Sequence, residues 1–393
     1  MHFNSLLTIT AYLSSLALAS EEPSRVISYL SDIRYKDTSL IHELNSKRKF
    51  MKREDVSVAS DFHQTLITFP LYLGTEGQKL TTVADTGSFK LWVLDEASFG
   101  SSEQLCEDGS CFTTSESSTF AETTEAFSVT YNSDFGASGK WATDKLSLDG
   151  TESTTFKFGL ATSYYGNNGG YSFAGLGYTE DYEGDNTLIL EAMVKGGLVD
   201  KKIVSFAYEQ DNLNWGDDIM TTGTITFGGA SNTTSDDLKY FDIISKTDIS
   251  IGFKSVSHGS TVVDCDSTSK GKIVVDTGTT SFSAKQKYYD ALFSEITFDT
   301  DNPSFFSCST YADYEIKIAL DDDSTISVPL MDISWNYYQD DYDLCQPMIS
   351  TLNDDDDAEM IFSQYFLKSL LTVIDIDSMQ VGFAPRSSGS SWA

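Results

Sequence analysis

A short motif that occurs twice holds the residues in this chain that are best suited to acid–base chemistry. Residues 83–88, VADTGS, recur as residues 274–279, VVDTGT, 191 residues later. A single Asp-Thr-Gly most simply forms a turn at the end of a strand, because Asp caps backbone amides and Gly accepts positive φ. One given tripeptide is expected about 0.1 times by chance in a chain of this length. Two copies, each after an apolar run and before a hydroxyl residue, indicate a shared task.

Asp85 and Asp276 are the candidate catalytic residues. Two carboxylates held face to face cannot both ionise, so they share one proton, and the pair can act as base and acid together. The ionised member would take a proton from a bound water while the protonated member polarises a carbonyl group. The reaction predicted is hydrolysis of an amide bond through a tetrahedral diol, with no covalent intermediate, no metal and no cofactor.

The other residues of the two motifs are expected to hold this pair in place. Their glycines let backbone amides approach the carboxylates, and the hydroxyl residues that follow can donate hydrogen bonds to the outer carboxylate oxygens. The threonines can tie the two loops to each other. These supporting residues are Thr86, Gly87 and Ser88 in the first copy and Thr277, Gly278 and Thr279 in the second.

The elements that must carry these loops are mostly strands. Period-two apolar runs bounded by Gly, Asn, Asp and Ser predict strands at 65–73, 127–131, 156–161, 203–208, 223–227, 272–275, 314–320 and 325–330. Helical patterns are confined to 187–195, 284–293 and part of 361–371. The sequence therefore predicts an all-β protein with a few short helices.

Length and charge narrow the function classes. With 393 residues and 40% hydrophobic side chains, the chain can form two domains or one large bilobed domain. Its 26 basic and 59 acidic side chains give a formal net charge of -33. A surface that binds nucleic acid needs clustered Lys and Arg, and an anionic membrane would repel this chain. Neither is an expected partner.

The charge changes sign near residue 53. Residues 1–53 carry 8 basic and 5 acidic side chains, whereas the rest of the chain carries 18 and 54. Residues 1–19 contain an apolar stretch from Leu6 to Ala19 that ends in Ala17-Leu18-Ala19, which predicts a signal peptide for export; a buried N-terminal helix is the alternative. Residues 20–53 are polar with helical character, and they predict a basic pro-segment that is cut after Lys52-Arg53. An ordinary basic surface helix is the alternative there.

Cysteine usage agrees with export. We expect two disulfides, Cys106–Cys111 around a four-residue loop and Cys308–Cys345 across a strand pattern. Cys265 is left over, and we expect a buried thiol outside any disulfide. No paired Cys-x-x-Cys exists, and residues 54–393 contain only two histidines, so a zinc site is not expected.

Smaller sequence features fit an exported and soluble chain. Asn232 begins a sequon, Asn232-Thr233-Thr234, and is the expected glycosylation site. The acidic runs 321–323 and 354–357 lack the spacing of a calcium-binding loop and predict solvated loops. The C-terminal residues are polar, so no lipid anchor is expected.

These motifs resemble the pepsin-like aspartic proteases, especially the secreted yeast branch with candidapepsins, yapsins and barrierpepsin. The resemblance covers about residues 60–385. Residues 85–93, DTGSFKLWV, look like the family's first catalytic loop with its following Trp, and residues 275–280, VDTGTT, look like the second. Further similar segments, in the family order, are FSVTY at 127–131, FAGLGY at 173–178, GTITFGG at 223–229 and VGFAP at 381–385.

The resemblance implies two β-lobes related by a pseudo-twofold axis, with a peptide bound between them. It divides the mature chain into an N-terminal lobe at 54–235, with Asp85 and a flap, and a C-terminal lobe at 236–393, with Asp276. It places Tyr131 at the flap tyrosine, which closes over the substrate. A strand tyrosine is otherwise a half-buried packing residue, and Trp92 is expected to be core packing that supports Tyr131.

This chain departs from the family pattern at two positions. Asn132 stands where a Gly usually follows the flap tyrosine. Ser363 replaces the Gly that packs behind the second catalytic loop, where a side chain could tilt the loop and perturb Asp276.

The function expected from these features is a secreted, acid-active aspartic endopeptidase that is made as a zymogen. Its expected partners are protein and peptide substrates and its own pro-segment, and we expect a monomer. The alternative is a catalytically silent module on the same fold that binds peptides or proteins. Serine hydrolase chemistry is disfavoured because no Gly-x-Ser-x-Gly is present and His is scarce.

Overall fold

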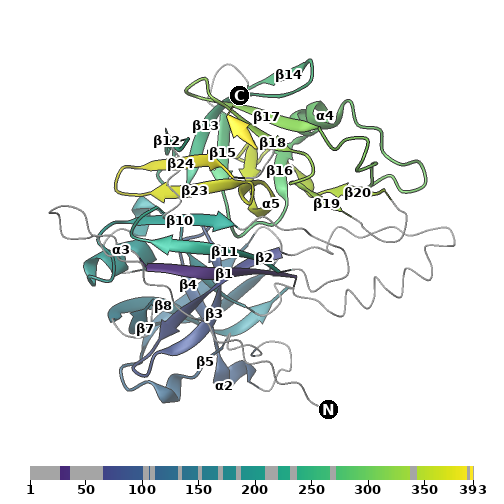
Figure 1. The fold of residues 1–393 in the computed structure, drawn as a ribbon. Coiled ribbons are helices and arrows are strands. Elements are labelled where there is room, and N and C mark those ends of the chain that lie inside the picture. Colours follow the sequence, from purple (N-terminus) through teal and green to yellow (C-terminus); the bar gives the residue numbers. More distant parts are fainter. Residues whose placement is uncertain are drawn as a thin grey trace, which may run out of the picture.

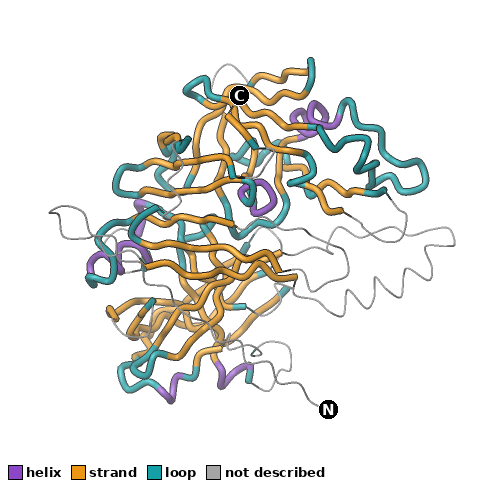
Figure 2. Tube along the Cα trace, in the orientation of Figure 1, coloured by secondary structure: helices purple, strands orange, loops and turns teal. Residues whose placement is uncertain are grey.

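The structure is a computed structural model, and strands make up most of what it describes (Figures 1 and 2). The described residues are 27–35, 65–100, 106, 111–131, 135–148, 153–166, 171–182, 187–208, 220–230, 237–265, 271–336, 343–386 and 390–392. Helices within these ranges are short: α2 (Glu96–Phe99), α3 (Ile189–Lys195), α4 (Gln286–Phe293), α5 (Gln364–Leu367) and the 3-10 turns η3 (Thr114–Glu116) and η4 (Glu180–Tyr182). The all-β prediction is confirmed.

The larger sheet runs through both halves of the chain. In spatial order its strands are β12 (Lys239–Asp242), β24 (Gln380–Pro385), β23 (Leu370–Asp375), β10 (Ile203–Tyr208), β11 (Met220–Phe227), β1 (Ile27–Tyr35), β2 (Thr65–Leu73), β3 (Gln78–Asp85), β9 (Ser172–Gly175), β4 (Leu91–Asp95), β8 (Ser153–Tyr165), β7 (Gly136–Ser147) and β6 (Ala121–Thr130). The short β5 (Cys111–Phe112) pairs with β4. Strands from the C-terminal half therefore continue the sheet of the N-terminal half across residue 235.

The second sheet belongs to the C-terminal half. Its order is β21 (Ile349–Leu352), β16 (Phe282–Lys285), β22 (Met360–Phe362), β15 (Gly271–Val275), β13 (Ser250–His258), β17 (Glu315–Leu320), β18 (Thr325–Pro329) and β25 (Ser391–Trp392). The hairpin strand β14 (Thr261–Asp264) pairs with β13, and β19 (Ser334–Asn336) pairs with β20 (Cys345–Pro347) in a separate ribbon. In Figure 1 this sheet lies above the larger one.

Each sheet contains one copy of the repeated motif, at the end of a largely buried strand. Asp85 is the last residue of β3, which runs parallel to β9 with Asp85 opposite Gly175. Val275 ends β15, which runs parallel to β22 with Val275 opposite Phe362. Two strand ends, one in each sheet, thus present the two aspartates.

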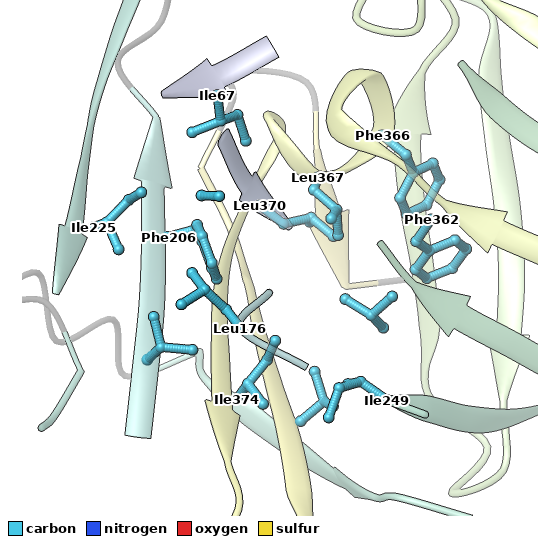
Figure 3. Packing of buried hydrophobic residues seen from close by; sticks show 14 of the residues in the cluster. Ile67, Leu176, Phe206, Ile225, Ile249, Phe362, Phe366, Leu367, Leu370 and Ile374 are labelled. Carbon is cyan, nitrogen blue, oxygen red and sulfur yellow. The ribbon is translucent and has the colours of Figure 1, made fainter. Parts of the chain in front are cut away.

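A hydrophobic core that is shared by both halves fixes these strand ends. Alternate residues of β2 point into it, because strand side chains alternate between the two faces; Ile67, Phe69, Leu71 and Leu73 are all buried. Figure 3 shows residues from distant parts of the chain packing together there, among them Ile67, Leu176, Phe206, Ile225, Ile249, Phe362, Phe366, Leu367, Leu370 and Ile374.

The predicted elements match the structure closely, with one exception. Strands were expected over 65–73 and 203–208, and β2 and β10 have these bounds. The helical character expected for segment 20–53 is wrong for residues 27–35, which form strand β1 between β11 and β2. A strand in that place finds backbone hydrogen-bond partners on both edges, and such long-range pairing overrides a weak local helical pattern.

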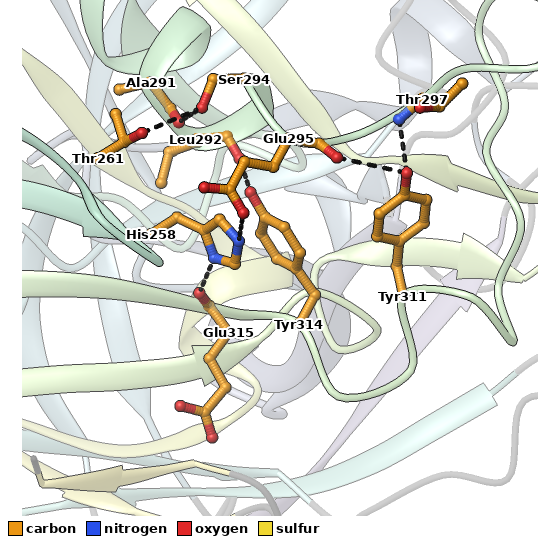
Figure 4. Close-up of polar contacts among 10 residues, drawn as sticks. All are labelled: His258, Thr261, Ala291, Leu292, Ser294, Glu295, Thr297, Tyr311, Tyr314 and Glu315. Carbon is orange, nitrogen blue, oxygen red and sulfur yellow. Dashed lines mark hydrogen bonds and ion pairs between the residues drawn. The ribbon is translucent and has the colours of Figure 1, made fainter.

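His258 illustrates how the C-terminal half is joined together (Figure 4). Its Nδ1 lies 3.0 Å from the Glu315 carbonyl oxygen, and its Nε2 lies 3.5 Å from a Glu295 carboxylate oxygen. Its ring stacks on Tyr314, whose hydroxyl donates to the Leu292 carbonyl. These contacts connect β13, β17 and the end of α4, so the role of this histidine is structural packing.

Both expected disulfides are present, Cys106–Cys111 and Cys308–Cys345. Cys265 is part of neither, and its half-buried thiol contacts the hydroxyl of Tyr288. Within the described ranges, no helix has the length and apolar character needed to cross a membrane.

The two disulfides should differ in their contribution to stability. They link residues 37 and 5 apart in sequence, so the chain-entropy model gives about 4 kcal/mol for Cys308–Cys345 and about 2 kcal/mol for Cys106–Cys111. We expect the double variant Cys308→Ala/Cys345→Ala to lose more free energy of unfolding than Cys106→Ala/Cys111→Ala. Urea unfolding followed by tryptophan fluorescence measures both, and an equal or reversed order would contradict the expectation.

Candidate active site

The structure brings Asp85 and Asp276 into direct contact. Asp85 is buried, Asp276 is half-buried, and the two carboxyl groups are within hydrogen-bond reach of each other. Burial first, and then the negative charge of Asp276, raise the pKa of Asp85 well above its usual range. A pair in this arrangement keeps one proton where two isolated carboxyl groups would both be ionised.

Each motif glycine leaves the space that the opposite aspartate occupies. A Cβ atom added to Gly87 would lie 2.4 Å from the Cγ atom of Asp276, and one added to Gly278 would lie 2.3 Å from Oδ1 of Asp85. Both distances are far below van der Waals contact. Any larger residue at either position would force the two carboxyl groups apart.

Hydrogen bonds from its own loop orient each carboxyl group. Asp85 accepts at Oδ1 from the Gly87 amide at 2.9 Å and at Oδ2 from the Ser88 hydroxyl. Asp276 accepts at Oδ1 from the amides of Gly278 at 2.8 Å and Thr279 at 3.2 Å, and at Oδ2 from the Thr279 hydroxyl at 2.6 Å. Asp276 therefore accepts one more hydrogen bond from its own loop than Asp85 does.

Thr86 and Thr277 tie the two loops together in a reciprocal network. The Thr86 amide donates to Oγ1 of Thr277 at 3.1 Å, and the Thr277 amide donates to Oγ1 of Thr86 at 3.0 Å. The Thr86 hydroxyl donates to the Val275 carbonyl, and the Thr277 hydroxyl donates to the Ala84 carbonyl, both at 2.8 Å. Both threonines are fully buried, so these four bonds are shielded from competing water.

Ser363 and Gln364 form hydrogen bonds to the backbone of the second loop. Ser363 is buried, and its hydroxyl donates to the Thr280 carbonyl at 2.9 Å, so it bonds to the loop rather than only packing against it. Gln364 donates from Nε2 to the Thr277 carbonyl at 2.8 Å. The sequence did not assign Gln364 a role, because its partner, the Thr277 carbonyl, is 87 residues away in the chain.

Tyr131 stands at the end of β6 and reaches toward the first loop. Its hydroxyl accepts a hydrogen bond from Nε1 of Trp92 at 2.8 Å and contacts the Ser88 side chain. Its ring stacks on Phe135, 4.3 Å between centroids, where the two strands of the β6–β7 hairpin meet the turn. Trp92 is fully buried and stacks on Phe173, so it is core packing that supports Tyr131.

Hydrogen bonds thus connect the hairpin to the aspartate pair. Trp92 donates to Tyr131, Tyr131 contacts Ser88, and Ser88 donates to Asp85. Burial, and after it the charge of Asp85, raise the pKa of Tyr131, so its hydroxyl stays protonated. It is available as a neutral hydrogen-bonding group at any pH where the pair is active.

Several predicted positions lie outside the described residues. They are Asn132, the glycosylation site Asn232, the dibasic pair Lys52 and Arg53, and the segments 1–26 and 36–64. Within the described part, no group of three or more His, Cys, Asp or Glu side chains is arranged to hold a metal ion.

Comparison with known proteins identifies similar chains. The family model for eukaryotic aspartyl protease matches residues 68–386. Secreted aspartic protease 3 of Candida albicans is 26% identical over 348 residues, which cover 85% of this chain and 83% of that protein. Secreted aspartic protease 10 of the same species is 25% identical, covering 88% and 77%. The probable aspartic-type endopeptidase opsB of Aspergillus oryzae is 29% identical over 198 residues, covering 47% and 38%.

Loss of the Thr277 hydroxyl should destabilise the fold. Thr277→Val keeps the side-chain shape but leaves the Thr86 amide and the Ala84 carbonyl buried without this partner. We expect a loss of about 2–4 kcal/mol in the free energy of unfolding, because each unpaired buried group costs about 1–3 kcal/mol. Thr277→Ser, which keeps the hydroxyl, is the matched control. Equal losses for Val and Ser in urea unfolding would show that the hydroxyl contributes nothing.

The raised pKa of Asp85 predicts a specific dependence of stability on pH. The unfolded carboxyl loses its proton near pH 4, whereas the folded one keeps it up to about pH 8. Its stabilising contribution is therefore complete below about pH 4 and declines as pH rises through that window, by at most about 1.4 kcal/mol per pH unit. Asp85→Asn should remove this contribution.

The measurement is the free energy of unfolding in urea at a series of pH values from 4 to 8. Asp181→Asn, which removes an exposed carboxylate of the same half, serves as the control and should follow the wild-type slope. A slope in Asp85→Asn that equals the slope of this control would contradict the assignment of a raised pKa to Asp85.

Proposed function

The chain belongs to the eukaryotic aspartyl protease family and is an aspartic-type endopeptidase, and we propose that Asp85 and Asp276 are its catalytic pair. We further propose that it acts on proteins outside the cell at acid pH, after loss of a basic pro-segment. The observation that carries the assignment is the reciprocal packing of the two motif loops, in which each glycine makes room for the opposite aspartate.

The geometry supports a division of roles between the two carboxyl groups. The raised pKa of Asp85 makes it the proton carrier, which leaves Asp276, held by three hydrogen bonds from its own loop, to act as the base. A water that bridges the pair would give a proton to Asp276 as its oxygen attacks the scissile carbonyl carbon. Asp85 would donate its proton to the carbonyl oxygen, which yields a neutral tetrahedral diol.

Collapse of the diol then needs the proton to move in the other direction. Asp276, now protonated, would give its proton to the leaving amine nitrogen, and Asp85 would recover a proton from a diol hydroxyl. The pair returns to one shared proton, so no net charge change is required of the enzyme. Tyr131 supports this cycle by holding Ser88, the residue that fixes Asp85.

Four observations support export and a pro-segment. The first nineteen residues have the pattern of a signal peptide, and the Candida albicans relatives carry the word secreted in their names. Residues 27–35, which belong to the proposed pro-segment, pair as β1 with β11 and β2. The basic segment also has a charge opposite to that of the body, and acid protonates the body's carboxylates and so weakens this attraction.

The test is a cleavage assay on the expressed full-length chain. Incubation with an unfolded protein near pH 4, followed by mass spectrometry, should reveal internal cuts in the substrate, and a cut after Arg53 in the enzyme itself. Asp85→Asn and Asp276→Asn should each lower the cleavage rate by at least about 10³-fold, because neither variant can carry a shared ionised and protonated pair.

Asp181→Asn is the matched control, and it should cleave like the wild type. Cleavage by either dyad variant at the wild-type rate would overturn the catalytic assignment. A fully active chain that keeps residues 20–53 attached would overturn the pro-segment proposal while leaving the catalytic pair intact.

A further inference from the structure

Lys90 is a basic residue that lies five positions after Asp85 in the sequence, next to the first motif loop. It follows Ser88 by two residues, and its backbone is fixed, because its carbonyl accepts from the Gly175 amide at 3.0 Å. Two further backbone bonds hold the same loop, from the Gly177 amide to the Ser88 carbonyl and from the Leu176 amide to the Asp85 carbonyl. The position of Lys90 relative to Asp85 is therefore as rigid as the catalytic loop itself.

The ammonium group of Lys90 lies between the hairpin and an aromatic pair. Its Nζ is 3.4 Å from the carbonyl of Ser128, which is on β6 three residues before Tyr131. On the other side it lies 5.7 Å from the ring centre of Phe89 and 5.8 Å from that of Tyr182. Those two rings pack against each other, with 4.8 Å between centroids. The charge of Lys90 thus lies next to strand β6, which leads to Tyr131.

Lys90 has no carboxylate partner among the described residues. None lies within 4.0 Å of its ammonium, although the chain carries 59 acidic side chains. The nearby Glu180 at the start of η4 pairs with Lys246 instead, at 3.0 Å. Other lysines of the two halves do have such partners; Lys140 on the same hairpin pairs with Glu122 and Lys272 pairs with Asp248.

A half-buried cation without a counter-charge is energetically unfavourable. Burial lowers the pKa of Lys90, since desolvation disfavours its charged form. An anion that binds beside it would replace the lost hydration and be stabilised in turn. The weak contacts with the Ser128 carbonyl and the two rings leave the ammonium able to accept such a partner.

We propose that Lys90 is a specificity-determining residue that selects an acidic side chain of the substrate within a few residues of the scissile bond. The inference rests on the proposed function, in which a peptide lies between the aspartate pair and the β6–β7 hairpin. A peptide held there passes the strand that contains Ser128, and the ammonium group of Lys90 lies against the Ser128 carbonyl of that strand. The chain is strongly acidic overall, so an acidic preference would come from this local cation against the general charge of the protein.

The test compares peptides that differ only in charge at one position. A reference peptide without charges near its cleaved bond is changed at successive positions on both sides of that bond to Glu, Gln or cysteic acid. At pH 5.5 the active enzyme should cleave the Glu peptide about 3- to 10-fold better than the Gln peptide, in kcat/KM, at one or two adjacent positions. At pH 3 the Glu preference should vanish, because Glu is protonated below about pH 4.3, while the preference for cysteic acid should persist.

Variants of Lys90 identify the source of the preference. Lys90→Met should remove it, Lys90→Glu should turn it into a preference for Lys, and Lys90→Arg should retain it. Lys140→Met is the matched control, because its charge is on the same hairpin and already has a partner, and its ratio should equal that of the wild type. The ratio of the kcat/KM values of two peptides, measured with the same enzyme preparation, is independent of the fraction of that variant that is folded.

The outcomes separate this inference from the proposed function. Cleavage of the reference peptide with an equal Glu-to-Gln ratio in wild type and Lys90→Met overturns the role of Lys90 and leaves the protease assignment standing. Failure of the wild type to cleave the reference peptide, or any other peptide of the series, overturns the proposed function itself.

Discussion

The fold depends on bringing two like-charged groups into contact and holding them there with neutral hydrogen bonds. Asp85 and Asp276 would repel each other if both were ionised, and no metal-binding cluster or cationic partner is seen beside them in the described chain. What opposes the repulsion is a set of buried bonds between Thr86 and Thr277 and the backbone of the opposite loop. Because these bonds carry no net charge, they neither depend on pH nor favour one protonation state of the pair.

The reciprocity of this arrangement explains why the motif occurs twice. Each loop contributes a threonine hydroxyl, a threonine amide and a backbone carbonyl that bond to the other loop, and a glycine whose missing side chain leaves room for the opposite aspartate. The two loops therefore make the same set of contacts with each other. A single copy could not meet its own requirements. The sheets complete the constraint, since Asp85 ends β3, Asp276 follows β15, and a core shared by both halves fixes the two strand ends relative to each other.

The sequence was sufficient to predict what is encoded locally. The repeated motif identified the aspartates and their supporting residues, and the alternating pattern of β2 gave its bounds without error, because both signals lie within a few consecutive residues. Strand β1 was missed, since its conformation comes from pairing with β11, about 190 residues away. The sequence did not assign roles to Gln364 and Lys90 either. The Gln364 amide contacts the Thr277 carbonyl and the Lys90 ammonium contacts the Ser128 carbonyl, and both partners are distant in the sequence.

Acidity connects the surface of this protein with its active site. The formal charge of -33 makes the chain repel itself near neutral pH, and protonation of surface carboxylates relaxes this repulsion as pH falls. The raised pKa of Asp85 acts in the same direction, because the proton that removes repulsion within the pair is retained by the folded state alone. In the mechanism proposed above, that proton is also the one transferred to the substrate carbonyl. Stability and the proposed catalysis therefore depend on the same protonated form of the pair.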